Sequence, residues 1–213
     1  QMAALPPQAF SGMKSNQMGQ MPPEAMAGMN QQQMQQLPPN AFAGFNPNQI
    51  DAMPPAAFSG MKPTQMQQMP PNAFSGFSPQ QVSAMPPNAF SGMKSNQMGQ
   101  MPPDAFGGFS PQQMNALPPT AMAGMQPNQF AALPSSAFGS MSAKQMDVIP
   151  NNALAAITPN QFRSLTPEVL ASMSPEQRNA LPQQALNPAQ LNAPTNGTNN
   201  SALVGALNGW NMN

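Results

Sequence analysis

A sixteen-residue phrase repeats without insertion along most of this chain, and that periodicity constrains the fold more than any other feature. The phrase begins eleven times between residues 5 and 165, and the copy at residues 69–84 reads MPPNAFSGFSPQQVSA. A fixed period of this kind is typical of solenoids, in which each unit buries its apolar face against neighbouring units. We therefore expect one repetitive rod in place of separate globular domains.

Each repeat divides into two halves of eight residues, and both halves have the pattern of a helix start. Proline stands third in each half, which suits the first position of a helix. In the second half, Ser78 and Gln81 predict a capping box at the helix N-terminus. In the first half, Pro70 occupies the cap position, so no side chain should cap that helix. Gly76 ends the first half and predicts a left-handed turn there.

The apolar residues support this interpretation, because they recur at positions 1, 6, 9 and 14 of the repeat. All 12 Phe and 21 of the 22 Met fall on these positions, where Leu, Ile and Val also occur. Such interchange at a fixed spacing is typical of a packed core. The prediction is an all-α solenoid of 16-residue repeats with two very short helices per repeat, stacked as eleven to twelve coils of two helices each. The handedness of the solenoid is left open, and a rod of about 100 Å follows from ordinary helix spacing.

The repeat divides the chain into three regions. Residues 1–132 form the regular array. Residues 133–193 diverge and gather half of the charged residues, as expected of a terminal cap. Residues 194–213 form a polar linker and a C-terminal segment. Because residues 1–4 match the end of a repeat, we expect the array to be cut from, or to belong to, a longer precursor.

Two groups of residues are candidates for contacts between copies of the chain. Glutamine stands at position 13 of all eleven repeats. It serves either as the local helix cap or as a ladder of exposed amides that bonds a partner chain or glycan. The C-terminal segment has apolar residues at helical spacing, which indicate either a cap on the last coil or an arm that docks on the next subunit. The candidate assembly contacts are Gln17, Gln33, Gln49, Gln65, Gln81, Gln97, Gln113, Leu203, Leu207 and Trp210.

The methionine ladder raises the alternative of a soft metal site, because thioether ligands suit Cu(I). Core packing is the better interpretation, since Leu and Phe replace Met at the same positions. No metal and no cofactor is therefore predicted. The chain has no Cys, His or Tyr, and it offers no nucleophile–base pair and no phosphate-binding loop. We accordingly expect no enzymatic activity.

The charge balance further limits the possible partners. Six basic and six acidic residues give zero net charge, so no basic face is expected for nucleic acid. No apolar run is long enough for a membrane span. An almost uncharged, amide-rich surface offers little electrostatic resistance to association. The predicted partners are other copies of the chain, in a homopolymer.

The phrase Pro-Pro-x-Ala-Phe, followed by a glycine and a second proline-led helix start, resembles short-helix tandem repeats of large secreted and cell-surface proteins. The resemblance covers residues 1–193 and implies an extracellular or cell-surface location. The predicted function is that of a structural, self-assembling extracellular protein, the subunit of a fibre, sheath or matrix. The alternative is a solenoid that binds a protein or glycan partner at the cell surface. A storage protein and a Met-rich metal-binding protein are further alternatives.

Overall fold

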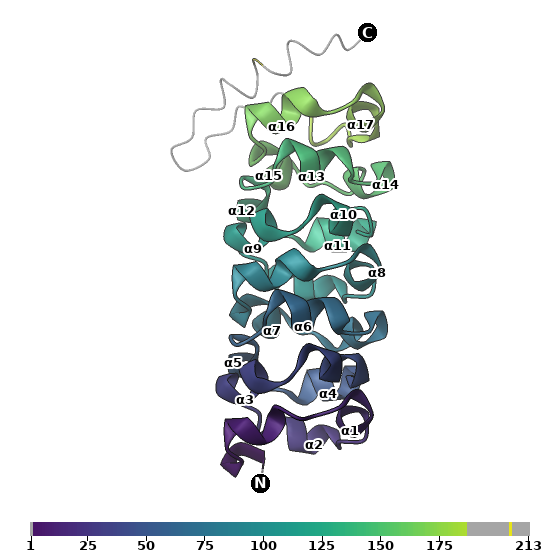
Figure 1. Ribbon diagram of the computed structural model, residues 1–213. Helices are drawn as coiled ribbons and strands as arrows, with labels where there is room; N and C mark the ends of the chain where they lie inside the picture. Colours follow the sequence, from purple (N-terminus) through teal and green to yellow (C-terminus); the bar gives the residue numbers. More distant parts are fainter. Residues whose placement is uncertain (1, 187–204, 206–213) are drawn as a thin grey trace.

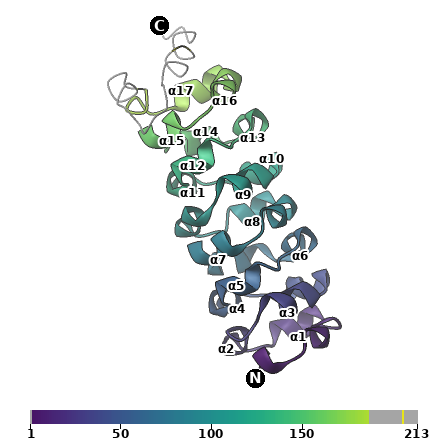
Figure 2. The same cartoon turned by 90° about the vertical axis from the view of Figure 1, so that its left-hand side faces the viewer.

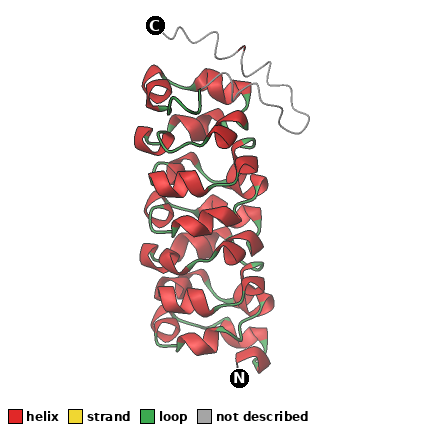
Figure 3. Ribbon diagram, turned by 180° about the vertical axis from the view of Figure 1, so that it is seen from behind, coloured by secondary structure: helices red, strands yellow, loops and turns green. Residues whose placement is uncertain are grey.

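The computed structural model describes residues 2–186 and residue 205. Helices and connecting turns make up this part of the chain, and Figure 3 shows no strand in it. The expectation of an all-helical array with two very short helices per repeat is confirmed. The predicted C-terminal contacts Leu203, Leu207 and Trp210 lie outside the described residues.

The second half of each repeat forms one short helix, as the capping pattern predicts. Ser78 shows the geometry, because its side chain accepts a hydrogen bond from the backbone N–H of Gln81 while the Gln81 side chain accepts one from the backbone N–H of Ser78. The helices of this type are η1 (Met2–Ala4), α1 (Ser15–Gly19), α3 (Gln31–Gln36), α4 (Pro47–Ala52), α6 (Pro63–Gln68), α7 (Pro79–Ala84), α8 (Ser95–Met98), α9 (Pro111–Ala116), α11 (Pro127–Ala132), α13 (Ala143–Asp147), α15 (Pro159–Arg163) and α17 (Pro175–Ala180).

The first half of each repeat forms a helix without a side-chain cap, as expected, except at α16, where the Thr166 side chain accepts a hydrogen bond from the backbone N–H of Val169. At η4 the preceding Pro70 is extended, and its side chain makes no capping bond. Helices of this type alternate along the chain with those of the second half, and several are 3-10 helices. They are η2 (Pro7–Phe10), α2 (Pro23–Met26), η3 (Pro39–Gly44), α5 (Pro55–Phe58), η4 (Pro71–Gly76), η5 (Pro87–Gly92), η6 (Pro103–Gly108), α10 (Pro119–Met122), α12 (Ser135–Phe138), α14 (Asn151–Leu154) and α16 (Pro167–Ser172).

The helices stack into a rod in which each turn takes up three helices. Every extensively packed pair has two helices between its members along the chain: α3 packs on α5, α5 on α7 and α7 on η6. The expected coil of two helices is therefore wrong. One turn contains one and a half repeats, so the rod has fewer turns than expected. Helices that stack on each other from turn to turn form a column, and the two helix types alternate along each column.

The columns wind around the rod axis. In Figure 1 the helices α3 and α5 lie at the left of the rod, whereas α14 and α17 of the same column lie at the right. Figure 2 shows the same rod from its side, with α1 and α2 at one end and α16 and α17 at the other. Helices α12 and α14 of the divergent repeats continue this stacking by packing on α9 and α11. Because a repeat has two helices and a turn has three, successive repeats place the same position in different columns. A given repeat position therefore appears on all sides of the rod.

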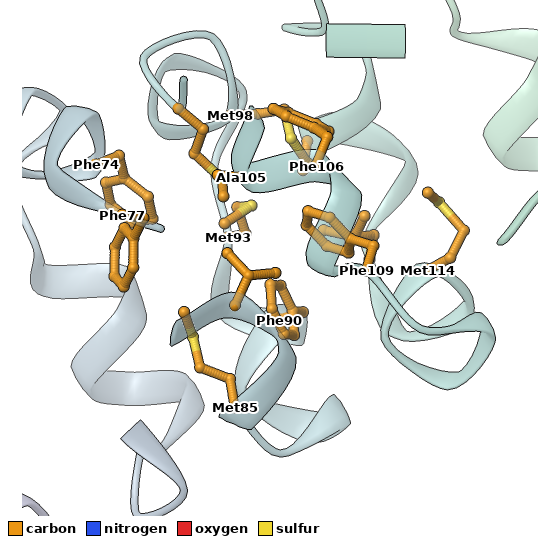
Figure 4. Close-up of a cluster of buried hydrophobic side chains, with 14 of the residues drawn as sticks. Phe74, Phe77, Met85, Phe90, Met93, Met98, Ala105, Phe106, Phe109 and Met114 are labelled. Atoms are coloured by element: carbon orange, nitrogen blue, oxygen red, sulfur yellow. The ribbon is translucent and has the colours of Figure 1, made fainter. Parts of the chain in front are cut away.

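The core is one apolar column that runs the length of the described solenoid. Residues at repeat positions 1, 6, 9 and 14 are buried from Met26 to Met173. Phenyl rings meet both within a repeat and between turns, with centroids 5.4 Å apart for Phe74 and Phe77 and 5.2 Å apart for Phe58 and Phe77. Figure 4 shows this mixture of phenyl rings and methionine side chains around Phe90 and Phe106. The predicted core positions are confirmed.

The glycine at repeat position 8 has a different role from the one expected. None of these glycines in the described repeats has the positive φ of a left-handed turn. A Cβ atom added to Gly76 would instead overlap the carbonyl oxygen of Pro47 in the adjacent turn, and Gly108 meets Pro79 in the same way. Glycine is needed because two backbones approach closely between turns.

Candidate functional site

The glutamine at repeat position 13 connects successive turns of the rod. In Gln81 the Oε1 atom accepts a hydrogen bond of 2.9 Å from the backbone N–H of Ser78. Its Nε2 atom donates to the carbonyl oxygens of Ile50, at 2.7 Å, and Met53, at 2.8 Å. One amide thus caps the start of its own helix and the end of a helix that lies 31 residues earlier in the chain.

The same pair of inter-turn bonds recurs along the array. Gln33 donates to Met2 and Leu5, and Gln161 donates to Phe130 and Leu133, at the same sequence separations. Gln177 differs, because it donates to the carbonyl oxygens of Met146 and Asp147. The glutamines at this position that are at most 4 % exposed are Gln33, Gln49, Gln65, Gln81, Gln97, Gln113, Gln129, Gln145, Gln161 and Gln177. We call these ten residues the glutamine ladder.

The ladder changes the interpretation of the candidate contact residues. The capping role expected of position 13 is confirmed, but the amides of Gln33, Gln49, Gln65, Gln81, Gln97 and Gln113 are buried within the chain. They are therefore not the exposed amides that the alternative role required. Among the described residues, no buried side-chain N or O atom lacks a hydrogen-bond partner. The ladder is part of the structure that holds the turns together.

The second role of the glutamine was missed from sequence, although one signal pointed to it. Gln65 and Gln97 follow lysine at the cap position, and neither Lys62 nor Lys94 offers a side-chain cap. Glutamine nevertheless persists there, and in both cases its Nε2 atom donates to two carbonyls of the preceding turn. In these repeats the glutamine Oε1 atom still accepts from the lysine backbone N–H, and only the reciprocal side-chain bond of the capping box is missing.

Gln17 is the exception, because its side chain is exposed. Its Oε1 atom accepts from the backbone N–H of Lys14 at 2.9 Å, but its Nε2 atom has no acceptor among the described residues. Core positions beside it are also open. Leu5 is 47 % exposed, and Met13 and Met21 are partly exposed, whereas Leu37 at the equivalent position is 2 % exposed. We call Leu5, Met13, Gln17 and Met21 the first-turn face.

The last glutamine of the ladder is Gln177, near the C-terminal end of the described array. Position 13 of the following degenerate repeat is Ala193. No glutamine of the ladder reaches the carbonyl oxygens of Phe162 and Leu165, which occupy the acceptor positions of the next step. Arg178 replaces the apolar residue at position 14, and its Nε atom donates to the carbonyl oxygen of Met173.

A shallow hollow lies on the outer surface of the described solenoid. Pro111, Gln112, Asn115 and Ser140 line an open depression of about 360 Å³. Ser140 stands where the first eight repeats have glycine. Its hydroxyl oxygen lies 2.8 Å from the carbonyl oxygen of Pro111 and 2.9 Å from that of Ala137, and its single hydrogen donates to one of them. The hollow has neutral polar walls and no titratable group in its lining. It therefore offers hydrogen-bonding groups to a neutral ligand but no acid–base chemistry.

The described acidic residues form no grouping suited to metal binding. No three His, Cys, Asp or Glu residues come together within residues 2–186 to hold a metal ion. Most thioethers lie in the core, with Met66 and Met98 fully buried. Hydrogen bonds to the carboxylate, chiefly from the backbone N–H of Glu176 and also from Ser174, lower the pKa of Glu176 at the start of α17. That carboxylate lies on the surface, where it contributes to helix capping.

No helix within the described residues has the length and apolar character needed to cross a membrane. Comparisons with models of protein families and with curated protein sequences find no match to this chain.

Proposed function

We propose that this chain is a structural, self-assembling repeat protein, the subunit of an extracellular fibre, sheath or matrix. The observation that carries the proposal is the construction of the rod itself. A single apolar column is held by the same pair of inter-turn hydrogen bonds at each step from Gln33 to Gln161. An interface that repeats inside one chain is suited to repetition between chains, and heterologous contacts of that kind generate open filaments.

The surface charge supports the same proposal. Twelve charged residues among 213 and zero net charge leave little electrostatic repulsion between rods. The hollow at Ser140 is shallow and neutral, and the described acidic residues form no group of three that could hold a metal ion. These features fit a structural role without enzymatic activity. The extracellular location rests on the resemblance of the repeat to those of secreted proteins.

Concentration-dependent assembly tests the proposed function. The 213-residue chain should form regular filaments in negative-stain electron microscopy as its concentration is raised at physiological salt. Sedimentation velocity on the same samples should show a growing distribution of sizes. A monomer that persists at millimolar concentration would exclude a self-assembling role.

A binding module for a glycan or protein is the second candidate, and the hollow at Ser140 favours it. Amide and hydroxyl groups beside a proline ring suit a neutral sugar, which pairs polar edges with an apolar face. Chemical-shift changes confined to Gln112, Asn115 and Ser140 on addition of neutral oligosaccharides would support this candidate. Their absence, together with filament formation, would support the structural role.

A further inference from the structure

The charged side chains are distributed unevenly over the columns of stacked helices. One column consists of α1, η3, α6, η5, α9, α12 and α15. When each N-cap residue is counted with its helix, this column carries the basic residues Lys14, Lys62 and Arg163 and no acidic residue. We call these helices and their N-cap residues the basic column.

A second column holds most of the carboxylates. It consists of α2, α4, η4, α8, α10, α13 and α16, and we call these helices and their N-cap residues the acidic column. Its acidic residues are Glu24, Asp51, Asp147 and Glu168, all of them exposed, and its basic residues are Lys94 and Lys144. The acidic column therefore has a net charge of −2, whereas the basic column has a net charge of +3.

We propose that the basic column of one copy lies against the acidic column of a second copy, so that the rods associate side by side. The inference deepens the proposed function and rests on it, because it names the lateral contact of the fibre, sheath or matrix. Opposite charges favour this pairing, whereas two basic columns or two acidic columns would repel each other. The basic column has too few cations for a polyanion, whose binding draws on many phosphate contacts.

The charged groups that would meet across this contact are accessible. Lys62, Asp51 and Asp147 are exposed, and Arg163 is partly exposed. The Nζ atom of Lys62 donates to the carbonyl oxygen of Gln35 at 2.8 Å, which orients the ammonium group and leaves it further hydrogens to donate. Among the described residues, no ion pair joins these two basic and two acidic residues to another side chain.

The two columns carry these charges at matching intervals. From Lys62 on α6, the basic column continues through η5, α9 and α12 to Arg163 on α15, four turns away. From Asp51 on α4, the acidic column continues through η4, α8 and α10 to Asp147 on α13, also four turns away. A second copy can therefore bring both carboxylates against both cations at once. Because the columns wind around the rod axis (Figure 1), two rods joined in this way would wind around each other.

Neutral polar side chains occupy the intervals between the charges. Asn88 and Gln112 are exposed on the basic column, and Asn72 and Asn96 are exposed on the acidic column. Side-chain amides both donate and accept hydrogen bonds, so the two rows can pair directly or through water. One exposed ion pair contributes little by itself. The choice of partner surface therefore depends on the whole row of charges and amides.

Charge reversals on the two columns test the proposal. Lys62→Glu places a carboxylate on the basic column, and Asp51→Lys places an ammonium group on the acidic column. In sedimentation velocity of the whole chain, each variant alone should need a concentration about tenfold higher than wild type to associate. A mixture of the two variants should associate as wild type does, because each supplies the charge that complements the other. Asp104→Lys, on η6 outside both columns, changes the net charge as Asp51→Lys does and should leave association unchanged.

The outcomes separate this inference from the proposed function. Association of wild type that neither reversal weakens, or that Asp104→Lys weakens equally, would overturn the paired columns while the structural role stands. Loss of association in Lys62→Glu alone would show that the basic column meets some surface other than the acidic column, and would also overturn the proposal. A wild type that never associates would exclude both.

Two further measurements keep the test independent of folding defects. Circular dichroism should show the same helix content in wild type and in all three variants. Salt at about 1 M, where the Debye length is about 3 Å, should weaken the side-by-side association of wild type without any substitution. Lateral association that salt leaves unchanged would contradict the contact between the charged columns.

Discussion

The Nε2 atom of Gln81 lies 2.7 Å from the carbonyl oxygen of Ile50, a residue 31 positions earlier in the chain. This bond joins the start of α7 to the end of α4. Its counterparts occur in each turn, so the rod is held by polar contacts at its helix ends as well as by its apolar column. Buried amides with three hydrogen bonds are costly to replace, because each lost partner leaves another buried group unsatisfied.

Replacing Gln81 by glutamate should destabilise the rod, whereas the same change at the adjacent, exposed Gln80 should not. In Gln81→Glu a carboxylate oxygen faces the carbonyls of Ile50 and Met53, and both carbonyls lose the side-chain donor, although Ile50 still accepts from the backbone N–H of Met53. A loss on the order of 3–5 kcal/mol is expected at neutral pH, as for other uncompensated buried charges. Chemical denaturation followed by circular dichroism measures it.

The stability of Gln81→Glu should also depend on pH. Burial beside two carbonyl oxygens raises the pKa of the introduced carboxyl group above its unfolded value, because the charged form is disfavoured. The folded state then prefers the protonated form, so the variant is least destabilised below the unfolded pKa. The penalty should grow as the pH rises from the unfolded pKa toward the folded one. A penalty that stays constant across the acid range would contradict the buried position.

Two adjacent glycines provide a test of the close contact between turns. A Cβ added to Gly108 would overlap the carbonyl oxygen of Pro79, whereas one added to Gly107 meets nothing within 4 Å. Gly108→Ala should cost about 1–3 kcal/mol, as overpacking does. Gly107→Ala should leave stability unchanged or raise it by about 0.4–1 kcal/mol, since alanine restricts the unfolded chain. Equal effects of the two substitutions on the denaturation midpoint would contradict the stacking.

Much of this architecture could be predicted from the sequence, and the features that were predicted wrongly have identifiable physical reasons. The helices, caps and core depend on local pattern, so Ser78 and Phe74 were assigned correctly. The number of helices per turn depends on the angle between successive helices, which the sequence period does not contain. Gly76 was misread because a left-handed turn and a close backbone contact both demand glycine. Gln81 was only half explained, since its second partner is remote in sequence.

A serine at the cap position of α8 should stabilise the array. Lys94 precedes that helix without a side-chain cap, whereas Ser110 caps α9 by accepting from the backbone N–H of Gln113. Lys94→Ser should therefore raise stability by about 0.5–1 kcal/mol, and Ser110→Ala should lower it by about 1 kcal/mol. Denaturation midpoints of the two single variants measure these opposite shifts. A lower denaturation midpoint for Lys94→Ser would show that the lysine side chain stabilises the fold by more than a serine cap does.

Oxidation of methionine should report the exposure of the first-turn face. Hydrogen peroxide converts a thioether to a sulfoxide when it can reach the sulfur. Met13 and Met21 are partly exposed, whereas Met66 and Met98 are fully buried. Peptide mass spectrometry of the folded, dilute chain should find sulfoxide first at Met13 and Met21. Uniform oxidation of all four would mean that the core is open to solvent.

The turn of three helices is most directly tested by distances between spin labels in this cysteine-free chain. Cysteines at the exposed residues 56 and 80 would place labels on α5 and α7, which pack on each other in adjacent turns. Cysteines at 56 and 72 would place them on α5 and η4, one sequence repeat apart. Packed helices lie about 8–10 Å apart, so the 56–80 pair should give the shorter distance. A shorter distance for the 56–72 pair would show that each turn holds two helices and would contradict the account.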